Sequence, residues 1–411
     1  MLAGLRVNNF KSLKAVDIEF KPVTIIIGPN GSGRSSILQS ILLLKKLHVN
    51  QGNISLSDLF NIEGYMNMGL WEQLAFDKRD PMEFCVLVKD NNISFKYNIN
   101  INRDGKLNAD GELQLAGVMG KFPRVTINLP YSQKMVQYIN INIKGGILAI
   151  NWNGFGANIT ISGSVPEDLK EKISSVINEW SKNVYFVPSP IAMYRRPSMT
   201  IQQAPSIDNI INSLKNSLVP HEDLLLLLLA IDSDLEDYVE SYVEELFKIK
   251  IKTKSIPPSI VEIRSKITKG KTALIVNEGG GVNRVAFLFT VIGLADKGST
   301  ILLEQPETNL HPDAQYRLAS ILVEMVKKDQ KQLIITTHSE HLLLGVLNSI
   351  AKGKLSLDDV AILYMYKGSN GESIAEKLEI DTHGRVKGGL PGFFETEIEE
   401  LLGMVAPKVV G

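Results

Sequence analysis

Apolar and polar positions alternate with a period of two in the first half of the chain. The clearest stretches are 5–10, 16–20 and the region 82–165, where Asn-Asn, Asp-Gly and Gly-Gly breaks separate short runs. Such alternation predicts strands with one buried face, and these breaks are typical of hairpin turns. We expect 5–10 and 16–20 to be two edge strands that lead into a strand at 23–27. We expect 82–165 to form an antiparallel sheet.

A helical period replaces this alternation over residues 206–248. Apolar side chains recur there every three or four positions, and residues 224–231 are apolar throughout. This spacing predicts helices. Two arrangements are open, an arm or lid inserted between two lobes, or helices that pack on the core. A further helix is expected at 167–182, followed by a buried strand at 184–187.

The apolar run 23–27 is followed by a glycine-rich loop and then by an apolar helical segment at 37–44. Glycines let successive backbone N–H groups turn inward around a triphosphate, and the start of a helix adds the positive end of its dipole. This order predicts a P-loop that binds ATP. Arg34 stands where such loops have lysine, and its planar fork is not interchangeable with an ammonium, so we expect slow turnover. The loop residues expected to bind nucleotide are Asn30, Gly31, Ser32, Gly33, Arg34, Ser35 and Ser36.

A second apolar run, at 300–303, ends at Glu304. A carboxylate at the carboxyl edge of a sheet, beside the hydroxyl of Ser35, is what a Mg²⁺ site opposite a P-loop requires. We therefore expect Ser35 and Glu304 to hold Mg²⁺ together with ATP.

Composition restricts the remaining possibilities. The chain has 411 residues, a formal net charge of -1 and one cysteine, Cys85. This length allows two or three domains or one bilobed unit. The charge gives no overall attraction to DNA or to an anionic membrane, so a DNA site must be a local patch. One cysteine excludes a disulfide within the chain and fits a reducing cytoplasm. Residues 1–10 lack the pattern of a secretory signal, and 224–231 is too short to cross a bilayer.

Two motifs together resemble the heads of the SMC, RecF and OLD branch of the ABC-type ATPases. They are the strand end Asn9-Phe10-Lys11-Ser12 and the loop Gly28-Pro29-Asn30-Gly31-Ser32-Gly33-Arg34-Ser35-Ser36. The resemblance implies an α/β P-loop fold of two lobes with an antiparallel β subdomain and a short helical insertion. It also implies that Lys11 approaches the phosphates, whereas the residues alone allow a solvated lysine at a strand end.

The same resemblance assigns roles in the second half of the chain. The turn 277–285 is similar to the ABC signature, which binds the γ-phosphate of a nucleotide held by the opposite subunit. Where ABC ATPases have a glutamate that polarises the attacking water, this chain has a glutamine, which cannot accept a proton. A nearby carboxylate could act instead, and a histidine after the third apolar run, 332–336, matches the switch histidine. The residues implied are Gly279, Gly280, Gly281 and Asn283 for the contact in trans, and Gln305, Glu307 and His338 for catalysis.

We expect three parts in the chain. Residues 1–188 form an N-terminal lobe with the P-loop and the β subdomain, 189–255 a helical insertion or arm, and 256–411 a C-terminal lobe with the signature-like turn, Glu304 and His338.

Two functions fit these features. In the first, two copies enclose two ATP–Mg²⁺ and the homodimer clamps DNA in chromosome organisation or repair, as in small SMC-like proteins similar to archaeal coalescins. Arg195 and Arg196 could then contact phosphate. In the second, the chain is a regulatory ATPase of an antiviral defence or toxin module that acts through a protein partner, which the near-neutral charge favours. Either would be cytoplasmic, with nucleoid association if DNA binds, and no membrane partner is expected.

Overall fold

A computed structural model gives the structure of residues 1–63, 65–115, 117–131, 136–166, 168–189, 206–256, 260–266 and 272–389. Arg195 and Arg196 lie outside these described residues.

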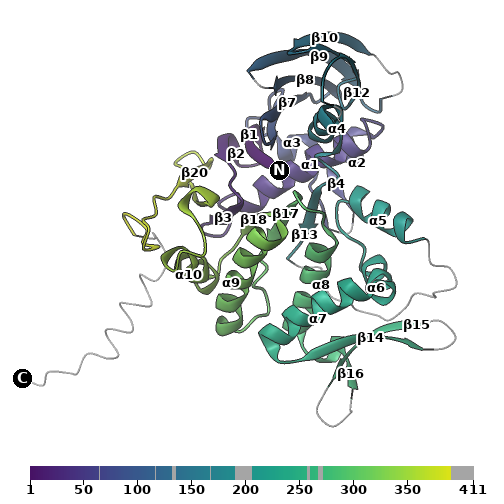
Figure 1. Cartoon of the computed structure of the whole chain (residues 1–411). Coiled ribbons are helices and arrows are strands. Elements are labelled where there is room, and N and C mark those ends of the chain that lie inside the picture. The colour runs from purple at the N-terminus through teal and green to yellow at the C-terminus, as the bar shows by residue number, and fades with distance from the viewer. Residues whose placement is uncertain are drawn as a thin grey trace, which may run out of the picture.

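The P-loop strand lies inside a six-stranded sheet at the centre of the molecule (Figure 1). The first five strands of this sheet are parallel, and the last is antiparallel to its neighbour. Most of them are nearly all apolar because both faces of the sheet are covered. Their order is β13 (Val184–Val187), β17 (Thr300–Glu304), β18 (Gln332–Thr336), β3 (Val23–Ile27), β19 (Val360–Lys367) and β20 (Ser373–Lys377).

Alternate residues of this central sheet point into two different cores. In β3, Ile26 packs in the core that the central sheet shares with the N-terminal antiparallel sheet, whereas Val23, Ile25 and Ile27 pack in the core formed with the later helices. The sheet is therefore the middle layer of the protein.

The second six-stranded sheet is antiparallel throughout, and helix α1 (Arg34–Val49) packs in the same core. The strands predicted between 82 and 128 are confirmed here. The prediction of two edge strands is wrong for 5–10, because that strand pairs on both sides and belongs to a different sheet from β3. The order is β2 (Leu13–Glu19), β1 (Leu2–Phe10), β6 (Met82–Asp90), β7 (Ile93–Ile101), β8 (Lys106–Leu115) and β9 (Val118–Asn128).

Small elements surround these two sheets. The rest of the predicted β region forms a separate sheet, and the helix predicted at 167–182 is a short α-helix continued by a π-helical turn at Ser175–Glu179. A two-stranded hairpin and two short helices lie after α1. These elements are β10 (Gln137–Ile143), β11 (Gly146–Trp152), β12 (Ala157–Gly163), α4 (Asp168–Ser174), α2 (Leu56–Leu59), β4 (Asn61–Ile62), β5 (Met66–Asn67) and α3 (Trp71–Leu74).

Six longer helices cover the other face of the central sheet. The buried residues of the three helices predicted at 206–248 belong to the same core as those of the later helices, so these helices pack on the sheet and do not project as an arm. None of the described helices is long and apolar enough to span a bilayer. The helices are α5 (Ile207–Asn216), α6 (Glu222–Ile231), α7 (Ser233–Phe247), α8 (Gly280–Leu294), α9 (Pro312–Asp329) and α10 (Glu340–Ala351).

A ribbon of three strands follows α7 and extends away from the central sheet (Figure 1). The boundary predicted after residue 255 falls inside the first strand of this ribbon, Lys250–Ile256. The lobes predicted at 1–188 and 256–411 both contribute strands to the central sheet, since β3 lies between β18 and β19. The ribbon strands are β14 (Lys250–Ile256), β15 (Ile260–Lys266) and β16 (Thr272–Leu274).

Candidate nucleotide site

The P-loop leaves β3 at the carboxyl edge of the central sheet. Gly31 and Gly33 have φ of 76° and 102°, in the left-handed region that favours glycine. A Cβ on Gly31 would meet no atom within 4 Å, and the buried hydroxyl of Ser32 has no partner among the described residues. Open space, an unpartnered hydroxyl and the start of α1 at Arg34 fit the phosphates of ATP.

The two predicted metal ligands lie at the same edge. β3 and β17 are parallel with only β18 between them, so Ser35, after β3, and Glu304, at the end of β17, share this edge. No group of three or more His, Cys, Asp or Glu residues that could hold a metal ion occurs in the described part of the chain. The hydroxyl of Ser35 and the carboxylate of Glu304 are oxygen donors that suit Mg²⁺, which would neutralise phosphate charge there, and their role as its ligands stays a prediction.

Arg34 does not point into the open space of the loop. Its Nη1 donates to the carbonyl oxygen of Thr337 at 2.5 Å, and its Nη2 contacts the imidazole of His338. Burial lowers the pKa of His338, and the charge of Arg34 lowers it further, so the ring accepts from the guanidinium as a neutral imidazole. The P-loop cation is thus engaged by the histidine predicted as a switch.

Glu304 is almost fully buried, and a tyrosine hydroxyl caps it. Tyr65 donates to both carboxylate oxygens, at 2.9 and 2.8 Å, and the backbone N–H of Ser189 lies 3.3 Å from one of them. Burial, more than the negative charge of Glu304, raises the pKa of Tyr65, which therefore stays protonated and able to donate.

Gln305 has the left-handed φ of 47° and is held by its surroundings. Its side-chain oxygen accepts from the hydroxyl of Ser189 at 2.9 Å. Arg284 donates to the carbonyl oxygens of Glu304 and Gln305, each at 3.0 Å, and to those of Pro188 and Ser189 at 3.1 and 2.7 Å. The buried guanidinium of Arg284 therefore fixes the two loops that follow β13 and β17.

Glu307, the predicted substitute for the missing base, supports the histidine loop. One of its oxygens accepts from the hydroxyl of Thr337 at 2.7 Å and from the backbone N–H of His338 at 3.0 Å. Its other oxygen is buried and has no hydrogen-bond partner among the described residues, and burial raises the pKa of the carboxyl.

The glycine turn predicted as a signature opens α8. Gly279 is exposed, with φ of 89°, and a Cβ there would meet no atom within 4 Å. Asn283 is only 2% exposed, because it lies on the inner side of α8. The contact of its side chain with a partner's phosphate stays a prediction. The backbone of the turn remains open to solvent.

Lys11 lies beside α1. Its ammonium donates to the side-chain oxygen of Gln39 at 2.7 Å, and burial lowers its pKa. Its approach to phosphates stays a prediction.

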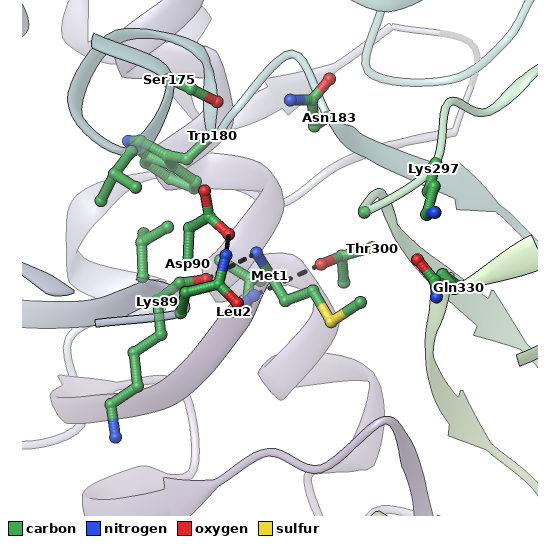
Figure 2. Close-up of a pocket in the computed structure, with 14 residues that line it drawn as sticks. Met1, Leu2, Lys89, Asp90, Ser175, Trp180, Asn183, Lys297, Thr300 and Gln330 are labelled. Atoms are coloured by element: carbon green, nitrogen blue, oxygen red, sulfur yellow. Dashed lines mark hydrogen bonds between the residues drawn. The ribbon is translucent and has the colours of Figure 1, made fainter. Parts of the chain in front are cut away.

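A separate cavity of about 480 Å³ lies at the opposite edge of the central sheet. Figure 2 shows Asn183, Thr300 and Gln330 around it, residues at or just before the amino ends of β13, β17 and β18. Because the P-loop lies at the carboxyl ends of these strands, this cavity is not the nucleotide site.

Sequence reasoning missed Tyr65, Ser189 and Arg284. A signal existed for Arg284, since it is the single charged residue in the apolar stretch 282–292, and such a residue usually has buried partners. Tyr65 lies in a stretch without periodicity, and nothing in the sequence marks its contact with Glu304.

Comparisons with known proteins agree with this geometry. A family model described as "AAA ATPase domain" matches residues 1–113 and 157–343. The chain belongs to the AAA ATPase domain family. It is an ATPase with the α/β head of the SMC, RecF and OLD type. The predicted fold and the predicted ATPase class are both confirmed.

Two curated relatives and one solved structure are similar to this AAA ATPase. An OLD nuclease of Thermus scotoductus is 22% identical over 363 residues, which are 82% of this chain and 59% of that protein. The DNA replication and repair protein RecF of Haemophilus ducreyi is 46% identical over 44 residues, 10% of this chain and 12% of that protein. The chain thus spans less than two thirds of either relative. An SMC head crystallised with the C-winged helix domain of ScpA has a TM-score of 0.52 at 16% identity, covering 92% of this chain and 98% of that one, and supports the fold alone.

Proposed function

We propose that this ATPase binds ATP–Mg²⁺ between the P-loop of one copy and the glycine turn of a second, and that the resulting homodimer acts on DNA. The observation that carries the proposal is the exposed Gly279, the N-cap of α8, where a Cβ would meet no atom of the same chain within 4 Å. The helix that this turn begins also carries Arg284, which contacts the loop after Glu304. A nucleotide bound at the turn would therefore be linked to the metal site of the same copy.

Slow hydrolysis is part of this proposal. Arg34 is engaged by Thr337 and His338, and a phosphate must compete with these contacts. Gln305 accepts a hydrogen bond and cannot accept a proton. ATP would then hold a closed dimer for long periods.

DNA is the partner that the names of the relatives favour, since one is a nuclease and the other a replication and repair protein. The alternative, a regulatory ATPase with a protein partner, is favoured by the ion pairs of two lysines in β14. Lys250 pairs with Glu244, and Lys252 pairs with three acidic residues of α7, so these lysines are not free for DNA phosphates.

The deciding experiment measures the mass of the protein in solution without nucleotide, with ADP and with ATP–Mg²⁺, and phosphate release in the same samples. We expect a dimer with ATP–Mg²⁺ only and little release. An unchanged mass with rapid release contradicts the proposal. DNA binding by the ATP-loaded dimer should weaken steeply with salt, because phosphate contacts release counterions. A salt-independent protein complex without DNA binding would favour the regulatory alternative.

A further inference from the structure

The hydroxyl of Tyr65 is hydrogen-bonded to the carboxylate of Glu304, on which the proposed metal site depends. It lies 2.9 and 2.8 Å from the two oxygens of Glu304, so one proton is shared between both acceptors. In the described part of the chain, no other side chain donates a hydrogen bond to this carboxylate. Any ion that used both oxygens would have to take the place of this hydroxyl.

Tyr65 lies in the turn of a small hairpin, β4 and β5, whose two strands have two residues each and whose Ile62 is buried in the core below the central sheet. The ring of Tyr65 meets Phe186 of β13 edge to face, with 5.0 Å between centroids. Isolated two-stranded hairpins are marginally stable, so contacts with the rest of the protein decide whether this one stays ordered. The bond to Glu304 is a charge-assisted hydrogen bond and the strongest kind available to it.

The hairpin is also connected to the P-loop helix. The amide nitrogen of Gln39, on α1, contacts the sulfur of Met66 at 3.0 Å, and the amide oxygen of Gln39 accepts from Lys11 at 2.7 Å. A movement of Tyr65 would therefore be transmitted to α1 and to Lys11.

We propose that Tyr65 is a latch on the metal site, which holds Glu304 when nucleotide is absent and is released when Glu304 is used for a metal. Tyr65 is a positioning residue, because it acts through Glu304. This inference rests on the proposed function, since it takes Glu304 as a metal ligand. Release of the hydroxyl would loosen the hairpin of β4 and β5. The mobility of this surface hairpin would then depend on whether the metal site is occupied.

The test is the affinity for Mn²⁺ at saturating ATP, measured by electron paramagnetic resonance of free Mn²⁺, for the full chain and for Tyr65→Phe. The variant keeps the ring against Phe186 and loses only the hydroxyl. We expect tighter Mn²⁺ binding by roughly tenfold, since a hydrogen bond to a charged group no longer competes. The matched control is Tyr185→Phe, on the same strand as Phe186. It removes a buried hydroxyl that has no hydrogen-bond partner among the described residues, and it should leave the affinity unchanged.

Hydrogen exchange of residues 61–67 gives a second readout. We expect slow exchange without nucleotide, faster exchange with ATP and Mn²⁺, and fast exchange in both states for Tyr65→Phe. Equal or weaker Mn²⁺ binding by Tyr65→Phe, or exchange equal to that of the unmodified protein, overturns the latch.

Glu304→Gln separates the two proposals. If this variant binds Mn²⁺ as the unmodified protein does, Glu304 is not a ligand and the proposed function fails at its metal site. If it loses Mn²⁺ binding while Tyr65→Phe behaves like the unmodified protein, only the latch fails.

Discussion

Arg34 and Thr337 are joined by a hydrogen bond of 2.5 Å from the guanidinium to the backbone carbonyl. This bond links the loop after β3 to the loop after β18, the two neighbouring strands whose carboxyl ends border the nucleotide site. His338 adds a second contact to the same guanidinium. In this conformation the P-loop cation stabilises the protein instead of facing a phosphate.

Replacing Arg34 with lysine should lower the stability of the fold and raise its affinity for ATP. An ammonium cannot reach Thr337 and His338 with the same fork, so we expect the free energy of unfolding without nucleotide to fall by about 1–2 kcal/mol. ATP affinity should rise, because the cation is released toward the phosphates. Urea denaturation and ATP titration measure the two effects. Arg6→Lys, at an exposed pair with Asp17, is the control and should change stability by less than about 1 kcal/mol. Unchanged stability with weaker ATP binding would contradict this prediction.

Arg284→Met should be far more damaging than a similar change at the surface. It removes the donors to four carbonyl oxygens in the loops after β13 and β17 and leaves these oxygens without that partner. We expect the free energy of unfolding to fall by about 3 kcal/mol. Arg317→Met is the matched control, since this partly exposed arginine donates to the carbonyls of Glu245 and Leu246. Urea denaturation of both variants checks the prediction, and equal losses would refute it.

Glu307→Gln should change how stability depends on pH. Burial raises the pKa of this carboxyl above its ordinary value of 4.5. The stability it contributes is therefore fully present below pH 4.5 and is lost as the pH rises through the folded pKa. The amide keeps an oxygen for Thr337 and His338 but never ionises. The stability of the variant relative to the unmodified protein should therefore increase as the pH rises above 4.5, by about 1.4 kcal/mol per unit of pKa shift.

Unfolding in urea at several pH values measures this gain. Glu324→Gln, at an exposed pair with Lys354, is the surface control for the same chemical change. If the difference in the free energy of unfolding between Glu307→Gln and the unmodified protein does not change with pH, folding does not shift the pKa of Glu307. If Glu307 replaces the missing base, phosphate release should also disappear in the variant.

Gly279→Ala should weaken the ATP-dependent dimer more than it weakens the fold. The new Cβ meets no atom of the same chain within 4 Å, so within one copy the cost is that of the backbone at φ 89° and ψ 160°, about 1–3 kcal/mol. Gly298→Ala is a close match, with φ of 85° and equally open space, but on a loop between α8 and β17. Mass in solution with ATP–Mg²⁺ should differ between the two variants. If both dimerise equally, the turn does not bind a partner's nucleotide.

The sequence predicted most strands, the P-loop and the order of the site motifs, because each is encoded by a local period or by glycines at fixed positions. It could not predict side-chain directions that depend on distant residues. Contacts with Thr337 and His338 determine the direction of the Arg34 side chain, and a contact with Glu304 determines that of Tyr65. The partners are more than two hundred residues apart in the sequence. The burial of Asn283 depends on the packing of α8, which a glycine-rich turn does not reveal.

The place of β3 in the central sheet has a consequence for synthesis on the ribosome. β3 emerges early, but its two neighbours, β18 and β19, are translated near residues 332–367. At about 5–20 residues per second, β3 waits on the order of tens of seconds before it can pair. The nascent chain therefore acquires its nucleotide site only after β18 and β19 have left the ribosome, and the apolar strand β3 stays without its sheet neighbours until then.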